Sequence, residues 1–336
     1  MPPTESRQSP ATVTLSASLA NKNHSRYGRA VPLTPRLLVV LVLFATACAG
    51  RTDDDGARPR VVASFYPLAF VVEEVGGALV ELENLTPPGA EPHDLELTAG
   101  QIRALADSDL VVYVGEGFQP SVEDALGEID SSVIDVLDRQ RDLLEATTHQ
   151  DEDDQGHEGD EHEGEMPVDP HVWLDPERLG LVADAVTERL TEIDPDNAER
   201  FRSNARRLQS RLSTLDAQFR NGLARCERST IVTSHEAFGY LADAYALEEI
   251  GITGIDPEAE PSPRRLAEIT EFVEENDVTT VFFEVLVPPQ TAETLAEEAG
   301  IQSARLDPLE GPPEAGDYFA AMRANLDALR RGLDCE

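Results

Sequence analysis

The chain has 336 residues and a formal net charge of −38 at pH 7, with 65 acidic residues against 27 basic ones. Binding to DNA or RNA needs a basic surface, and the only lysine, Lys22, lies near the N-terminus, so the composition excludes a nucleic-acid-binding protein. A strongly acidic surface is instead suited to attracting cations.

The N-terminal segment has the features of a secretion signal. An apolar run over 37–47 follows five basic residues and directly precedes Cys48. The run is too short for a transmembrane helix, which needs about 20 apolar residues, and the small residues before the cysteine suit a signal peptidase. The junction resembles the bacterial lipoprotein signal. We therefore expect a signal peptide over 1–47, a lipid on Cys48, a polar tether over 48–58 and an extracytoplasmic protein anchored to the cell membrane.

Short apolar strands alternate with amphipathic helices in the first half of the mature chain. The pattern predicts strands over 60–64, 80–85, 110–114 and 133–136, and helices over 67–76 and 98–106. Alternation of this kind indicates a parallel sheet with helices on both faces. We therefore expect an N-terminal α/β lobe over 59–175.

A segment of different composition interrupts this lobe. Residues 151–165 include nine acidic residues, three glycines and two histidines, and no basic residue. Such a stretch cannot bury a core, so we expect a loop over 149–165 that carries His149, His157 and His162.

Two helices and a second set of strands follow the acidic loop. Asp175-Pro176 and Asp194-Pro195 each predict a helix start, because Asp caps the first turn and Pro suits the first helical position. The first helix ends near Ile193, and the second has a single apolar stripe over 198–223 and would extend about 40 Å. The remaining pattern predicts strands over 230–233, 249–251, 280–284 and 303–306, and helices over 237–245, 262–276, 289–299 and 315–331.

The predicted fold class is therefore α/β, with two Rossmann-like lobes of parallel strands joined by a long rigid helix. We place the helical linker at 176–225 and the C-terminal lobe at 226–336. Ligands of parallel α/β sheets bind at the carboxyl ends of the strands, so the cleft between the lobes is the expected ligand site.

Three histidines outside the acidic loop share one setting. His93, His171 and His235 each flank a predicted strand end at a turn, and they come from both lobes. A single histidine in such a place is more often an ordinary polar residue. Three that converge on one cleft indicate a metal site.

The segments around these histidines resemble those of a known family. PPGAEPHDLELT, DPHVWLDP, TSHEAFGYLA and RLDPLEG are similar to the metal-site motifs of the zinc- and manganese-binding components of bacterial ABC importers, the ZnuA-like solute-binding proteins. The likeness covers about residue 60 to the C-terminus. It implies a monomeric lipoprotein that binds zinc between its lobes and delivers it to a permease and its ATPase.

The resemblance implies four metal ligands: His93, His171, His235 and Asp307. Three imidazoles and one carboxylate suit tetrahedral Zn²⁺, and His235 favours zinc because manganese-binding relatives tend to have a carboxylate at that position. The fourth ligand stays open. Some zinc-binding members use a glutamate near the first histidine or a water, which makes Glu91 an alternative, and Asp307 also suits an N-cap before Pro308.

Other acidic and histidine residues are assigned less directly. Asp94, Glu236 and Glu284 are candidates to orient the imidazoles, with solvated carboxylates as the alternative. Zinc-binding members of the family carry a histidine-bearing acidic loop, so the resemblance implies weak, exchangeable zinc capture by His149, His157 and His162. The alternative is a solvated linker.

The two cysteines that follow Cys48 both lie in the predicted C-terminal lobe. An extracytoplasmic compartment permits a disulfide between Cys226 and Cys335, but the sequence leaves a disulfide and two free thiols equally open.

Other functions fit parts of the sequence. A zinc hydrolase would share a three-histidine site, but His157 and His162 are five residues apart rather than four, and no GxSxG or GxGxxG motif is present. We therefore expect a protein without enzymatic activity. A manganese importer component, a surface adhesin and a zinc-storage lipoprotein are the remaining alternatives.

Deleting residues 149–165 should remove weakly bound zinc and leave the cleft site near its parental affinity. The loop must lose conformational entropy to converge on one ion, so its affinity should be lower than that of a preformed site. Its contribution should also fade above about 0.15 M salt, where the Debye length is about 8 Å. Calorimetric titration of both proteins at two salt concentrations measures this, and loss of the tight binding event on deletion would contradict it.

Overall fold

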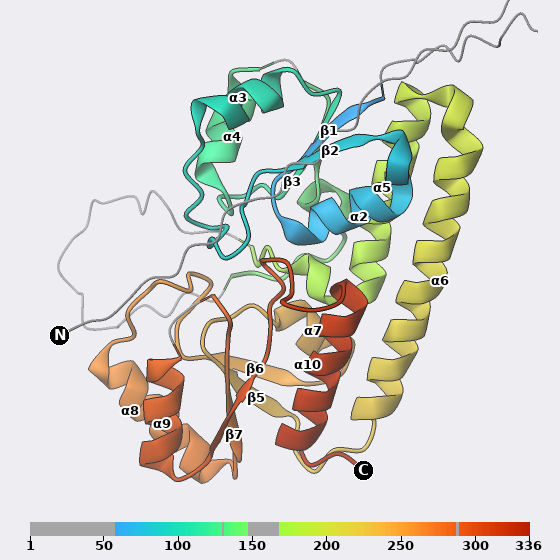
Figure 1. The fold of residues 1–336 in the computed structure, drawn as a ribbon. Helices are drawn as coiled ribbons and strands as arrows, with labels where there is room; N and C mark the ends of the chain where they lie inside the picture. The colour runs from blue at the N-terminus through green and yellow to red at the C-terminus, as the bar shows by residue number, and fades with distance from the viewer. Residues whose placement is uncertain (1–57, 130, 147–167, 287–288) are drawn as a thin grey trace, which may run out of the picture. The chain divides into compact units, whose positions relative to one another are not determined.

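The computed structural model describes residues 58–129, 131–146, 168–286 and 289–336 (Figure 1). The predicted signal peptide, Cys48, most of the tether and the three loop histidines lie outside these residues. Among the described helices, none combines the length and apolar character needed to cross a membrane.

The first lobe is built on a parallel sheet with the strand order β2-β1-β3-β4. Its strands are β1 (Arg60–Ala63), β2 (Glu81–Asn84), β3 (Leu110–Tyr113) and β4 (Val133–Asp135). Its helices are α2 (Tyr66–Gly76), α3 (Ala99–Ala106) and α4 (Pro120–Gly127), with short 3₁₀ helices at Gly77–Leu79 and Leu137–Arg139. All the strands and helices predicted for this lobe are present to within two residues, whereas α4 was not predicted.

Alternation of side chains along β1 and β3 gives this sheet two buried faces. Val61 and Val112 point into the main core with α2, whereas Val62 and Val111 point to a smaller core under α3 and α4. Strands that are buried on both faces read as continuous apolar runs, which explains the sequence LVVY of β3.

The second lobe repeats this arrangement with the strand order β6-β5-β7-β8, again all parallel. Its strands are β5 (Thr230–Thr233), β6 (Glu248–Gly251), β7 (Thr280–Phe283) and β8 (Gln302–Arg305). Its helices are α7 (Gly239–Ala244), α8 (Pro263–Glu275), α9 (Gln290–Ala299) and α10 (Tyr318–Gly332). The predicted α/β fold with two parallel sheets is therefore confirmed.

Two long helices connect the sheets. Asp175 caps α5 (Pro176–Ile193) by accepting a hydrogen bond from the backbone N–H of Glu177, and a 3₁₀ turn at Pro195–Asn197 leads into α6 (Ala198–Leu223). With 26 residues, α6 extends about 39 Å at 1.5 Å per residue. Its buried stripe packs against α5 and α2 on one lobe and against α10 on the other (Figure 1). One continuous helix thus supports both lobes.

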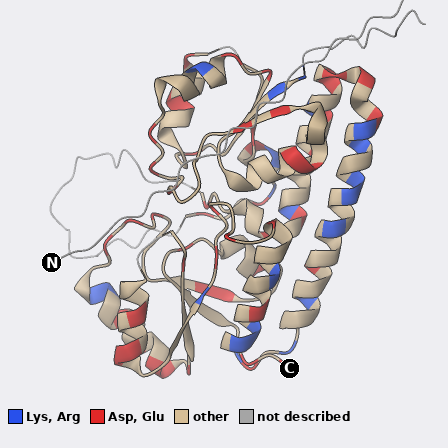
Figure 2. Ribbon diagram, viewed as in Figure 1, with Lys and Arg blue, Asp and Glu red and all other residues tan. Residues whose placement is uncertain are grey.

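The exposed side of α6 is basic, in contrast to the acidic helices α8 and α9. The helix carries six arginines and two acidic residues, whereas acidic residues prevail on α8 and α9 (Figure 2). Arg211 binds Glu74 of α2 and Asp317 at the start of α10, each at 2.7 Å. These half-exposed ion pairs contribute little free energy individually, but they link the helix to elements of both lobes.

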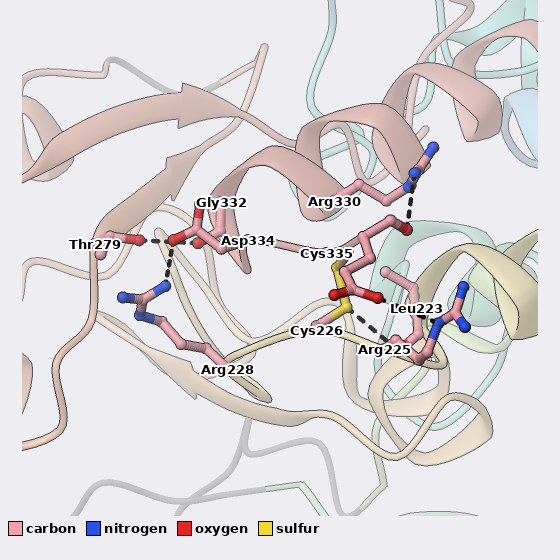
Figure 3. Close-up of a disulfide and its surroundings, with 10 residues drawn as sticks. Leu223, Arg225, Cys226, Arg228, Thr279, Arg330, Gly332, Asp334 and Cys335 are labelled. Atoms are coloured by element: carbon pink, nitrogen blue, oxygen red, sulfur yellow. Dashed lines mark hydrogen bonds and ion pairs between the residues drawn. A yellow bond between two sulfur atoms is a disulfide. The ribbon is translucent and has the colours of Figure 1, made fainter.

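A disulfide joins the C-terminal ends of α6 and α10. Cys226, just after α6, is bonded to Cys335, just after α10, and the two residues are 109 positions apart in the chain (Figure 3). Beside it, Arg228 pairs with Asp334, and the Thr279 hydroxyl donates a hydrogen bond of 2.9 Å to the carbonyl oxygen of Gly332. The disulfide thus ties the C-terminus to the point where the chain enters β5.

Replacing both cysteines by serine should lower the free energy of unfolding by about 2–5 kcal/mol, because the unfolded chain loses a long closed loop. Affinity for the expected zinc ligand should not change, since Cys226 lies at the amino end of β5 and ligands of parallel sheets bind at the carboxyl ends of the strands. Chemical denaturation and zinc titration of parent and variant measure the two effects. A large loss of zinc affinity at unchanged stability would contradict this account.

Candidate metal centre

Four side chains from distant parts of the sequence meet between the two sheets. One ligand atom from each of His93, His171, His235 and Glu310 lies within 4.8 Å of the other three. His93 follows β2, His235 follows β5 and Glu310 follows β8, while His171 directly precedes the 3₁₀ helix Val172–Leu174. The three strands contribute at their carboxyl ends, which is where parallel α/β sheets bind their ligands.

The distances within this cluster fit a single tetrahedral ion. Glu310 Oε1 lies 3.4 Å from Nε2 of His93, 3.3 Å from Nε2 of His171 and 3.7 Å from Nε2 of His235. The Nε2 atoms of His171 and His235 are 3.4 Å apart. Zinc bonds of about 2.0–2.1 Å in tetrahedral geometry place neighbouring ligand atoms about 3.3 Å apart. These four donor–donor distances are therefore close to those of one four-coordinate zinc ion, and the remaining pairs lie within 4.8 Å.

Two carboxylates orient the imidazoles of His171 and His235 by contacting Nδ1, the ring nitrogen that does not belong to the cluster. Asp169 Oδ1 lies 2.8 Å from Nδ1 of His171, and Glu284 Oε1 lies 2.6 Å from Nδ1 of His235. Each of these oxygens also accepts a hydrogen bond from the backbone N–H of the same histidine, at 2.9 Å and 3.2 Å. Such partners fix the ring and direct Nε2 toward the metal.

Only part of this supporting set was expected from the sequence. Glu284 was a candidate, whereas Asp169 was missed although it lies two residues before His171 in the DPH motif. Asp94 interacts with Glu258, and Glu236 lines a cavity of about 320 Å³ beside Asp169.

Burial and neighbouring charges shift the pKa values of these four residues in opposite directions. The side chains of His171, His235 and Glu310 are wholly buried, and that of His93 is 9% exposed. Burial lowers the pKa of His93. Burial also acts to lower the pKa of His171, but hydrogen bonds to Asp169 and Glu310 outweigh it and raise that pKa to about 9.

The other two members are shifted by the same partners. Burial is outweighed at His235 by the charge of Glu284, so the pKa of His235 lies well above its usual value. Burial would raise the pKa of Glu310, but hydrogen bonds with the three histidines hold it well below the usual range. Without metal, the pKa shifts therefore favour protons on His171 and His235 and a negative charge on Glu310.

The sequence-based choice of Asp307 as the fourth ligand differs from the geometry. The Asp307 carboxylate accepts a hydrogen bond of 2.9 Å from the Leu309 N–H and pairs with Arg305 at 3.1 Å. Leu309 has a left-handed backbone with φ of +57°, and this turn carries the next residue, Glu310, into the cluster. The motif RLDPLEG contains both carboxylates, and only the turn decides which one meets the imidazoles.

Glu91, the other alternative, lies beside the cluster rather than within the four. Its Oε1 atom accepts a hydrogen bond of 3.3 Å from the backbone N–H of His93. Burial, together with the nearby charge of Glu310, raises the pKa of Glu91 to about 8. The residue also lines a cavity of about 310 Å³ with Ser234 and Glu258.

Curated relatives with similar sequences are zinc-binding proteins by name. The chain is 34% identical over 308 residues to the zinc-binding lipoprotein AdcA of Streptococcus pneumoniae, an alignment covering 89% of this chain and 60% of AdcA. It thus spans about three fifths of that relative's length. It is 32% identical to the high-affinity zinc uptake system protein ZnuA of Bacillus subtilis, covering 88% of this chain and 96% of ZnuA.

Solved structures of similar fold include zinc-bound and adhesin proteins. The crystal structure of Zn(II)-bound AdcA from Streptococcus pneumoniae has a TM-score of 0.69 and 32% identity, covering 83% of this chain and 59% of that one. The laminin-binding protein Lmb of Streptococcus agalactiae, described as having adhesin and metal-transporting activity, has a TM-score of 0.72 and 30% identity, covering 82% and 99%.

The family model described as "Zinc-uptake complex component A periplasmic" matches residues 61–332, which include all four members of the cluster and both sheets. The chain therefore belongs to this ZnuA family of zinc-uptake components.

Proposed function

We propose that this protein binds Zn²⁺ outside the cytoplasm and delivers it to the permease and ATPase of a bacterial ABC importer. The observation that carries the proposal is the cluster of three imidazoles and Glu310, whose donor atoms lie within 4.8 Å of one another and whose His171–Glu310 and His171–His235 distances match a tetrahedral zinc site. We infer that His93, His171, His235 and Glu310 are the ligands, with Glu310 in place of Asp307. Relatives named for zinc binding and zinc uptake support the same cargo.

The donor set favours zinc over manganese. Three nitrogen donors and one buried carboxylate give a small, nitrogen-rich shell, whereas Mn²⁺ prefers more oxygen ligands and a higher coordination number. The burial of three of the four side chains leaves little room for added water. Zinc is therefore the proposed transported ion.

The same geometry argues against zinc chemistry on a substrate. A catalytic zinc site has three protein ligands and keeps its fourth position for water or substrate. Here Glu310 provides a fourth protein donor within 3.7 Å of every imidazole Nε2. A closed shell of this kind suits binding and release of the ion rather than hydrolysis.

The N-terminal sequence and the family support a proposal for the location and assembly of the protein. We propose a monomer anchored by a lipid on Cys48, with the loop histidines His149, His157 and His162 capturing zinc weakly near the cleft. We also propose that the first lobe ends at residue 175 and that the second lobe begins after residue 225. A protein held at the membrane surface would release zinc close to its permease.

A strain that lacks the gene for this protein tests the importer role directly. It should grow poorly when external zinc is scarce, because uptake then depends on high-affinity capture. The parental gene should restore growth and zinc accumulation, whereas a gene encoding His171→Ala should not. Equal zinc accumulation with and without the gene would favour the storage or adhesin alternatives.

Replacing Glu310 by Gln should weaken zinc binding about 100-fold or more, because it removes the only anionic ligand from a buried shell and leaves the ion's charge uncompensated. Asp307→Asn is the matched control. It removes a carboxylate three residues away but keeps an oxygen for the Leu309 N–H, so the affinity should change by only about threefold. Chelator competition measures both, and a reversed order would restore Asp307 as the ligand.

Zinc binding should release protons and weaken as the pH falls. The pKa of His171 is raised to about 9 and that of His235 lies well above its usual value, so both imidazoles are protonated at pH 7 before zinc binds. Each displaced proton weakens the apparent affinity by up to about tenfold per pH unit below the pKa. Calorimetry at pH 7 in two buffers of different ionisation enthalpy counts the protons. A buffer-independent enthalpy would contradict the expected release of about two.

A further inference from the structure

We propose that Trp173 and Tyr318 are positioning residues for zinc binding, which hold the Glu310-bearing turn against the His171-bearing segment. This inference rests on the proposed zinc site and names the two side chains that fix its geometry across the lobes. Neither side chain is among the four donors.

Two short buried hydrogen bonds connect the segments. The indole Nε1–H of Trp173 donates to the carbonyl oxygen of Pro308 at 2.7 Å, across 135 residues of sequence. The Tyr318 hydroxyl, at the start of α10, donates to the carbonyl oxygen of Trp173, also at 2.7 Å. Trp173 lies two residues after His171, and Pro308 lies two residues before Glu310. The two bonds therefore span the same gap as the metal cluster.

Trp173 is a rigid donor because its ring is packed on several sides. It is wholly buried, and its ring centroid lies 4.7 Å from Phe65, 5.5 Å from Phe118 and 5.0 Å from His171. Phe65 follows β1 and Phe118 follows β3, so the indole belongs to the packing of the first lobe. The position of its N–H is therefore fixed relative to the first lobe, next to His171.

The turn that receives this hydrogen bond is fixed from the other side by α10. The backbone N–H of Asp307 donates to the Asn325 side-chain oxygen at 2.9 Å, and the Asn325 amide donates back to the Asp307 carbonyl. These bonds fix the start of the turn, before the left-handed residue Leu309. The Pro308 carbonyl is the last anchored group before Leu309 and Glu310, so its orientation controls where the Glu310 carboxylate lies.

The zinc site depends on the position of this turn because a tetrahedral shell allows only small changes in the distances between its donor atoms. Glu310 Oε1 is 3.3 Å from His171 Nε2, close to the tetrahedral edge, and the two residues belong to different lobes. Displacement of the turn would leave three imidazoles and lengthen or remove the bond to the carboxylate. Sites held by a fixed supporting network lose less entropy on binding, so loss of the network should appear as faster zinc dissociation.

Trp173→Phe and Tyr318→Phe test the proposal because each removes one donor and keeps an aromatic ring. The loss of a buried hydrogen bond predicts about a tenfold weaker zinc affinity for Trp173→Phe and about a threefold loss for Tyr318→Phe, with most of each change in the dissociation rate. Thr279→Val is the matched control, since it also removes a side-chain hydrogen bond to a carbonyl, that of Gly332, but at the disulfide end of the lobe. It should lower the melting temperature without changing zinc affinity.

A double-mutant cycle separates positioning from general destabilisation. In the Glu310→Gln background the Trp173→Phe change should cost little further affinity, because its effect passes through the Glu310 carboxylate. X-ray absorption at the zinc edge should show the parental shell of three nitrogens and one short oxygen bond, and a longer or missing oxygen bond in Trp173→Phe. Tyr318→Phe supplies the same measurements if Trp173→Phe does not fold.

The outcomes of these measurements are distinguishable. If Glu310→Gln leaves zinc affinity unchanged, the proposed ligand set itself is wrong. If Glu310→Gln weakens binding but both aromatic variants bind zinc like Thr279→Val, the positioning proposal is overturned. Full additivity of Trp173→Phe and Glu310→Gln would also overturn it, because the tryptophan would then act independently of the carboxylate.

Discussion

The structure depends on one buried carboxylate, Glu310, lying among three imidazoles. A buried charge is unfavourable unless it is paired and hydrogen-bonded, and here each histidine Nε2 lies within 3.7 Å of the same oxygen. Asp169 and Glu284 bind the opposite ring nitrogens of two of the histidines. The raised pKa values of His171 and His235 favour protons on these two imidazoles without metal, and Zn²⁺ would replace those protons on binding. Zinc binding and proton release are therefore two descriptions of the same charge balance.

Bringing these residues together requires that the two lobes keep a fixed relation at the centre. The continuous helix α6 packs against α2 and α5 of one lobe and α10 of the other, and the disulfide between Cys226 and Cys335 ties α10 to the end of α6. At the centre itself, Trp173 binds the Pro308 carbonyl directly. The contacts of α6 and the Trp173 hydrogen bond hold together a site in which four of the six donor–donor distances are close to tetrahedral spacing, whereas the disulfide stabilises the far end of the second lobe. A pre-formed shell favours tight binding because little ordering remains to be done when the ion arrives.

The parallel sheets explain why the four residues of the cluster come from such distant positions in the sequence. In each lobe the strand order places the carboxyl ends of neighbouring strands at one edge, and the loops that follow β2, β5 and β8 supply His93, His235 and Glu310. His171 comes from the segment that precedes α5, which packs its Trp173 against Phe65 and Phe118. The family relationship and the fold are consistent with this arrangement, but the chemistry is carried by the four side chains and their supports.

The sequence alone determined the fold class, every described strand and most of the helices, with α4 missed, and it singled out the three histidines. Helix starts at Asp175 and Asp194, the stripe of α6 and the apolar runs of the strands are local signals, because capping and periodicity involve residues close in the chain. Only the tertiary structure placed Glu310, and not Asp307, beside the three imidazoles. The choice depends on the left-handed backbone of Leu309 and on bonds to Asn325 and Trp173, which lie 18 and 135 residues away from their partners. The tertiary structure likewise placed Asp169 beside Nδ1 of His171 and joined Cys226 to Cys335. Such contacts depend on the distance between residues in space, which no local pattern specifies.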